Sequence, residues 1–127
     1  MPFVRIDLAS GKSPEFLATL GDIVYRATVE VISVPENDKY IVVTEHAPTQ
    51  MHVTKNYLGM TYTADIIFIQ IFLIAGRSTE QKKKLYKRIN DDIHAKLKVR
   101  REDVFITLSG IAKDDISFGN GEAQYAQ

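Results

Sequence analysis

Chemistry could begin at the second residue of this chain, because Pro2 directly follows Met1. Initiator methionine is commonly removed when the next residue is small, and its removal would leave Pro2 with a free secondary amine. A model α-amino group has a pKa of about 7.7–8.0. An apolar pocket or a nearby arginine lowers the pKa of such an amine. A neutral amine can take a proton from carbon beside a carbonyl and return it elsewhere. Pro2 is therefore a candidate catalytic base.

The same proline has two other interpretations. If the amine keeps a high pKa, it is a cation that can only donate a proton, and hydration or decarboxylation becomes its natural role. A structural role is also open, because proline lacks the ladder donor and fits at the first residue of a strand. Retained Met1 would favour a non-catalytic binding protein, since the acylated Pro2 nitrogen is an amide without a basic lone pair.

Composition bounds the class of protein. We expect a single domain, residues 1–127. The absence of cysteine excludes disulfides, thiolate metal sites and a cysteine nucleophile. The 16 basic and 16 acidic residues balance, so no broad attraction to nucleic acid is expected. No apolar run reaches the roughly 18 residues of a membrane span, and no signal peptide is evident. We expect a cytoplasmic protein, without a metal site because its three histidines lack ligand spacing.

Hydrophobic periodicity predicts the elements that must position Pro2. Apolar residues alternate with polar ones over residues 2–8, as in a strand, and recur at helical spacing over residues 14–32. Ser13 is placed to cap this helix, and the Val34-Pro35 step to end it. The remaining predicted elements are strands at 40–46, within 64–74 and at 103–109, and a helix at 79–97.

Two stretches call for separate expectations. Residues 47–63 carry a proline, a glycine and scattered polar groups, so we expect a loop with a short extended piece near 51–53. Residues 64–74 form a continuous apolar run, which predicts a strand buried on both faces.

A shift of 65 residues aligns the two halves of the chain. Phe3 then matches Phe68, and Gly11-Lys12-Ser13 matches Gly76-Arg77-Ser78, without a gap from strand through helix to strand. The repeats span approximately 2–46 and 67–110, which indicates a duplicated β-α-β unit. Right-handed crossovers give an α/β fold in which two helices cover one face of a four-stranded mixed sheet. The other face needs a cover, and another subunit is the natural one.

The chain resembles the tautomerase superfamily, which includes 4-oxalocrotonate tautomerase and macrophage migration inhibitory factor. The resemblance rests on the early proline, the two repeats and the glycine–basic–serine turn. Within it, VPENDKYIVVTEH (34–46) and ISFGNGEAQY (116–125) are similar to segments of the malonate semialdehyde decarboxylase branch. The resemblance implies a homotrimer, active sites near subunit boundaries, Pro2 as the catalytic amine, a small carboxylate-bearing oxo or enol acid as substrate, and no cofactor.

The resemblance also assigns roles to two charged residues. Asp38 matches an aspartate that activates or orients water in the decarboxylase branch, and Arg77 matches an arginine that binds the substrate carboxylate. A guanidinium fork suits a carboxylate or a developing enolate oxygen. Each residue has a repeat counterpart, Asp103 and Lys12 respectively. A structural role in the turns therefore stays open for both.

The resemblance places Phe118 and Tyr125 in the pocket wall, although packing roles stay open for both. This chain departs from the decarboxylase pattern in two places: Ala75 stands where that branch has a second arginine, and Ile116 where it has a tryptophan. With one arginine gone, stabilisation of the enolate left by departing carbon dioxide is weakened. We therefore favour a tautomerase acting on small 2-oxo acids such as phenylpyruvate. The alternatives are a decarboxylase or hydratase acting on 3-oxo acids, and a non-catalytic trimeric binding protein.

Overall fold

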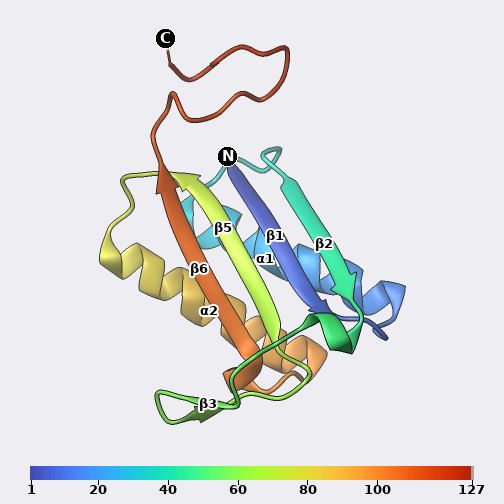
Figure 1. Cartoon of the computed structure of the whole chain (residues 1–127). Helices are drawn as coiled ribbons and strands as arrows, with labels where there is room; N and C mark the ends of the chain where they lie inside the picture. The colour runs from blue at the N-terminus through green and yellow to red at the C-terminus, as the bar shows by residue number, and fades with distance from the viewer. Residues whose placement is uncertain (127) are drawn as a thin grey trace.

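A computed structural model describes residues 1–126 of the chain. Each long helix lies between two long strands along it (Figure 1). The elements are β1 (Pro2–Ala9), α1 (Pro14–Ile32), β2 (Tyr40–His46), the 3-10 turn η1 (Pro48–Gln50), β3 (Asn56–Tyr57), β4 (Met60–Thr61), β5 (Ile67–Ile74), α2 (Thr79–Leu97), the 3-10 turn η2 (Arg101–Asp103) and β6 (Val104–Ile111).

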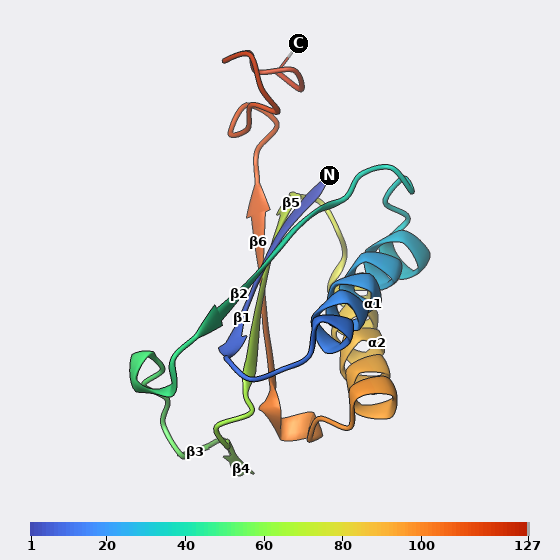
Figure 2. The same ribbon diagram turned by 90° about the vertical axis from the view of Figure 1, so that its right-hand side faces the viewer.

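The main sheet has four strands in the order β2-β1-β5-β6. β1 and β2 are parallel, as are β5 and β6, whereas the central pair β1 and β5 is antiparallel. Both helices cover the same face of this sheet, and the opposite face stays open (Figure 2). The predicted four-stranded mixed sheet with helices on one face is therefore confirmed. The antiparallel central pair brings the start of β1 beside the end of β5.

The duplicated β-α-β unit is also confirmed. β1 and β5, and likewise α1 and α2, begin and end at positions 65 residues apart. Ser13 and Ser78 cap the two helices through their side chains, as residues with short polar side chains do at helix starts. α1 ends at Ile32, slightly before the predicted Val34-Pro35 step, because Ser33 adopts a left-handed conformation with φ 60°.

The core lies between the sheet and the helices. The side chains of alternate strand residues face α1 and α2 and are fully buried, among them Val4, Ile6, Ile69, Ile71 and Leu73. On the other face the β5 side chains are half-buried, and Gln70 is exposed. Within one chain, β5 is therefore buried on one face only, in contrast to the predicted burial on both.

The connection from β2 to β5 differs most from its prediction. The short strands in it are β3 and β4, which form a hairpin, and residues 51–53 belong to no strand. β5 begins only at Ile67, because the residues before it bend to contact η2. None of the helices in residues 1–126 is long and apolar enough to span a membrane.

Candidate active site at the start of strand β1

A pocket of about 420 Å³ lies at the edge of the sheet where β1 begins. Its walls are mainly apolar and include Met1, Phe3, Tyr40, Phe72, Ile116 and Phe118. The antiparallel register of β1 and β5 places Phe3 opposite Phe72, and their rings stack with centroids 5.9 Å apart. The fold thus places the first residues of the chain in an aromatic hollow.

The chain terminus, which lines this pocket, also contacts a carboxylate outside the pocket lining. The Met1 amino nitrogen is 3.1 Å from Asp38 Oδ2, and the Met1 side chain is only 2% exposed. Pro2 follows as a buried residue paired with Leu73. Removal of Met1 would empty the space that its side chain occupies and would leave the Pro2 nitrogen as the terminal amine near Asp38. The structure therefore places Asp38 against the residue that precedes Pro2.

Arg77 lies at the same edge of the sheet but does not line the pocket. Its guanidinium donates from Nη1 to the carbonyl of Ile74 at 3.3 Å and from Nη2 to the carbonyl of Ile32 at 3.4 Å. These contacts tie the end of β5 to the end of α1. A guanidinium has five N–H donors, so further donors remain for a ligand. In this structure Arg77 has a structural role that the sequence interpretation had left open.

The two predicted wall residues belong to the segment that follows β6. Phe118 lines the pocket, with its ring centroid 6.1 Å from that of Tyr40. Tyr125 does not line the pocket, but it packs edge-on against Phe118 at 4.8 Å. The three aromatic rings form a row that begins at the pocket wall and extends along the C-terminal segment.

The repeat counterparts of Asp38 and Arg77 lie at the opposite edge of the sheet. There, other side chains and the backbone already bind them, and no free chain terminus is present. Asp103, the counterpart of Asp38, is fully buried and accepts hydrogen bonds from the backbone and hydroxyl of Thr63. Lys12, the counterpart of Arg77, lies 3.3 Å from Asp65. The residues that lead into β5, Thr63 and Asp65 among them, thus occupy at this edge the place that the chain terminus takes at the start of β1.

We expect this difference to be visible in stability. Asp103→Ala removes the buried acceptor of the Thr63 donors and of Arg100, so the free energy of unfolding should fall by about 2–4 kcal/mol. Asp38→Ala is the matched variant at the half-exposed counterpart and should change it by less than about 1 kcal/mol. Urea unfolding of both variants measures the two values. Equal losses would contradict the assignment of Asp103 as the structural member of the pair.

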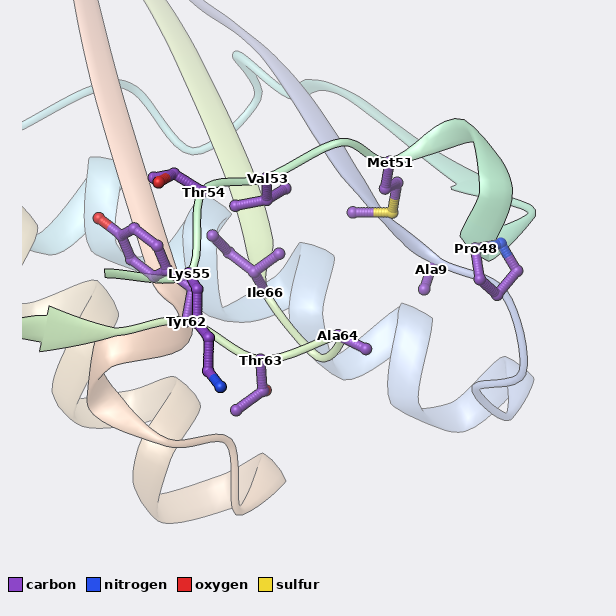
Figure 3. Close-up of a pocket in the computed structure, with 10 residues that line it drawn as sticks. All are labelled: Ala9, Pro48, Met51, Val53, Thr54, Lys55, Tyr62, Thr63, Ala64 and Ile66. Atoms are coloured by element: carbon purple, nitrogen blue, oxygen red, sulfur yellow. The ribbon is translucent and has the colours of Figure 1, made fainter. Parts of the chain in front are cut away.

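A second pocket of about 280 Å³ lies at that closed edge (Figure 3). Its walls are mostly apolar, with Met51, Val53 and Ile66 around the hollow. Neither a terminal amine nor a carboxylate lines it. Across residues 1–126, no group of three or more histidine, aspartate or glutamate side chains could hold a metal ion.

Sequence reasoning did not select Phe3, Tyr40 and Phe72 as pocket residues. Each occupies an outward position in its strand, although the continuous apolar run that contains Phe72 did not reveal that residue's position. Their convergence was not accessible from the pattern, because it depends on the register between β1 and β5 and between β1 and β2.

Comparison with known proteins places this arrangement among tautomerases. Two family sequence models, both described as tautomerase enzyme, match residues 38–119 and residues 2–60. A curated relative, the probable tautomerase YusQ of Bacillus subtilis (strain 168), is 43% identical over 124 residues, which cover 98% of both chains.

Solved structures share the whole fold. FG41 malonate semialdehyde decarboxylase, inhibited by 3-bromopropiolate, superposes with a TM-score of 0.88 at 35% identity, covering 97% of this chain and 93% of that one. The symmetric trimer of a wild-type fused 4-OT gives a TM-score of 0.81 at 26% identity, covering 98% of each chain.

Proposed function

This chain belongs to the tautomerase family, and we propose that it is a cofactor-independent tautomerase that acts on small 2-oxo acids such as phenylpyruvate. In this proposal it is a single-domain, cytoplasmic enzyme whose Pro2 becomes the catalytic amine once Met1 is removed. The observation that carries the proposal is the position of Pro2, which begins β1 directly after Met1, the residue that lines an aromatic pocket and whose amine contacts Asp38.

The proposed reaction moves one proton. In the direction from keto to enol, the neutral Pro2 amine takes a proton from the carbon beside the carbonyl, and the C–H electron pair forms the C=C bond. The amine then returns the proton to the former carbonyl oxygen, so no atom is gained or lost. Apolar walls such as Phe3 and Phe72 favour the neutral amine, because burial penalises its charged form.

Arg77 is the proposed anchor of the substrate carboxylate. It follows β5, whose end lies beside the start of β1, and its unused donors can bind two carboxylate oxygens at once. The apolar walls formed by Phe72, Ile116 and Phe118 suit the aryl group of phenylpyruvate better than a short polar chain. Pocket and anchor together favour an apolar 2-oxo acid.

A second candidate function is decarboxylation or hydration of a 3-oxo acid, as in the malonate semialdehyde decarboxylase branch. The contact of Asp38 with the Met1 amine favours it, because it shows a carboxylate close to the chain terminus, and a carboxylate near the Pro2 amine would stabilise an ammonium and thus a proton donor. Ala75 argues against decarboxylation or hydration, because it carries no charge where that branch has an arginine.

Rates on two substrates distinguish these candidates. We expect kcat/KM for phenylpyruvate tautomerisation to exceed kcat/KM for malonate semialdehyde decarboxylation when both are measured on protein that begins at Pro2. A preparation that decarboxylates malonate semialdehyde far faster than it tautomerises any enol would reverse the order of the two proposals.

The open face of the sheet supports a homotrimer as part of the proposal. Two aromatic pairs lie on this face, Phe3 with Phe72 and Phe68 with Phe105, and Phe105 is 40% exposed. A fused 4-OT with the same fold is a symmetric trimer. Burial of these rings between copies would remove apolar surface from water.

We therefore expect sedimentation equilibrium to give the mass of three chains. Phe105→Glu places a charge on the open face and should shift the equilibrium toward monomer. Lys84→Glu, on the exposed side of α2, is the matched charge change and should leave the mass unaltered. A wild-type mass equal to one chain at every concentration would remove the trimer from the proposal.

A further inference from the structure

Within the segment after β6, one glutamine bonds to two neighbouring residues, beside shorter-range bonds such as those between Ser117 and Gly119. Gln124 Oε1 accepts a hydrogen bond from the backbone N–H of Phe118 at 2.9 Å, and Gln124 Nε2 donates to the carbonyl of Gly119 at the same distance. Both ends of a single side-chain amide thus contact consecutive residues. We call this pair of bonds the Gln124 brace.

The brace closes a tight reversal of the chain. Gly119, Asn120 and Gly121 all have positive φ, at 143°, 60° and 69°. Glycine adopts such angles without a steric penalty, so the reversal costs little at Gly119 and Gly121. The reversal brings the chain back beside Phe118, where the reversal begins. Tyr125 packs there against Phe118 with ring centroids 4.8 Å apart.

The position of Phe118 therefore depends on contacts within its own segment. This segment extends beyond the sheet and away from both helices (Figure 2). Within residues 112–126 most of its residues are exposed, and only Phe118, Ile116 and Gln124 are half-buried. The ring of Phe118 is part of the pocket wall, 6.1 Å from Tyr40. Any loss of order in the segment would move that wall.

We infer that Gln124 is a positioning residue that holds the Phe118–Tyr125 pair against the Pro2 pocket and thereby sets the selectivity for substrates with a bulky apolar substituent. Gln124 touches no reacting atom, since it does not line the pocket. It acts through Phe118, whose ring forms the wall against which an aryl group would pack. This inference rests on the proposed function for its substrate, but not for the brace itself.

The test compares two substrates on Gln124→Ala. Exchange of the C3 protons for deuterium, followed by NMR, reports proton transfer for both phenylpyruvate and 2-oxobutanoate. We expect KM for phenylpyruvate to rise about tenfold, the effect of one or two lost hydrogen bonds, while kcat stays within about twofold. The parameters for 2-oxobutanoate, which is too short to need the wall, should stay close to wild type.

Two further variants sharpen this test. Gln50→Ala is the matched control, because Gln50 Oε1 also accepts a backbone bond, from Ala47 at 2.9 Å, but away from the Pro2 pocket. It should leave the selectivity unchanged. The double variant Phe118→Ala/Gln124→Ala should discriminate between phenylpyruvate and 2-oxobutanoate no less well than Phe118→Ala alone, since Gln124 acts through that ring. An unchanged phenylpyruvate KM in Gln124→Ala would overturn the inference.

A readout without substrate separates this inference from the proposed function. In Gln124→Ala the Phe118 amide loses its acceptor, so its hydrogen exchange should accelerate relative to wild type, while the amides of β1 keep their protection. If wild type transfers no proton from either acid, the proposed function fails, and the exchange rate of Phe118 still decides whether the brace exists. Equal exchange of the Phe118 amide in variant and wild type would mean that Gln124 does not hold Phe118 in place.

Discussion

Protein that retains Met1 is expected to tautomerise phenylpyruvate about 10²- to 10⁴-fold more slowly than protein that begins at Pro2, the range contributed by a positioned general base. Two physical effects act together. The Pro2 nitrogen is an amide while Met1 is attached and has no basic lone pair. The Met1 side chain, 2% exposed, also forms part of the wall of the pocket that the substrate would enter, so its retention narrows that space.

Both forms can be prepared from one sequence. A cleavable leader leaves Met1 at the terminus, and treatment of that protein with methionine aminopeptidase exposes Pro2, with intact mass as the check on each form. Pro2→Ala, also freed of Met1, keeps an amine without the ring and should retain part of the activity, because a primary amine can still transfer a proton. Equal rates for the two forms would exclude the Pro2 amine as the proton-transfer group.

Arg77→Ala is expected to lower kcat/KM for phenylpyruvate. The corresponding loss of transition-state stabilisation should be about 2–4 kcal/mol, the scale of a lost charged donor to a substrate oxygen. The geometry adds a second consequence. Arg77 donates to the carbonyls of Ile32 and Ile74, so its loss should also loosen the joint between α1 and β5. The free energy of unfolding must therefore be measured beside the kinetics.

Two variants separate binding from stability. Lys12→Ala removes the repeat counterpart at the closed edge and should leave kcat/KM near wild type. Arg77→Lys keeps the charge without the planar fork, so it should recover only part of the lost kcat/KM. If Arg77→Ala lowers stability but leaves kcat/KM for acid substrates unchanged, the carboxylate is bound elsewhere and Arg77 is a structural residue.

The repeated elements could be predicted from the sequence because local signals and the 65-residue shift agreed. Ser13 and Ser78 mark the starts of both helices, and alternation over residues 2–8 separated core residues such as Ile6 from outward ones, whereas the continuous apolar run that contains Ile71 gave no such separation. Each half therefore supported the interpretation of the other. For β1, the face that the helices cover followed from the same alternation.

The parts that could not be predicted depend on contacts between distant segments. The connection between β2 and β5 takes its path from Thr63, which donates to Asp103, a residue 40 positions away. The carbonyl partners of Arg77 follow from the meeting of α1 and β5. The Gln124 brace depends on a chain reversal rather than on periodicity. None of these contacts leaves a repeating pattern in the sequence.

The central claim, that the Pro2 amine serves as the base, is tested most directly by the dependence of kcat/KM for phenylpyruvate on pH. A base must be unprotonated to accept a proton, so kcat/KM should rise with pH through the neutral range in protein that begins at Pro2 and should lose this limb in protein that retains Met1. Activity that falls as the pH rises through the same range would show the amine acting as an acid, and activity that survives retention of Met1 would contradict the account as a whole.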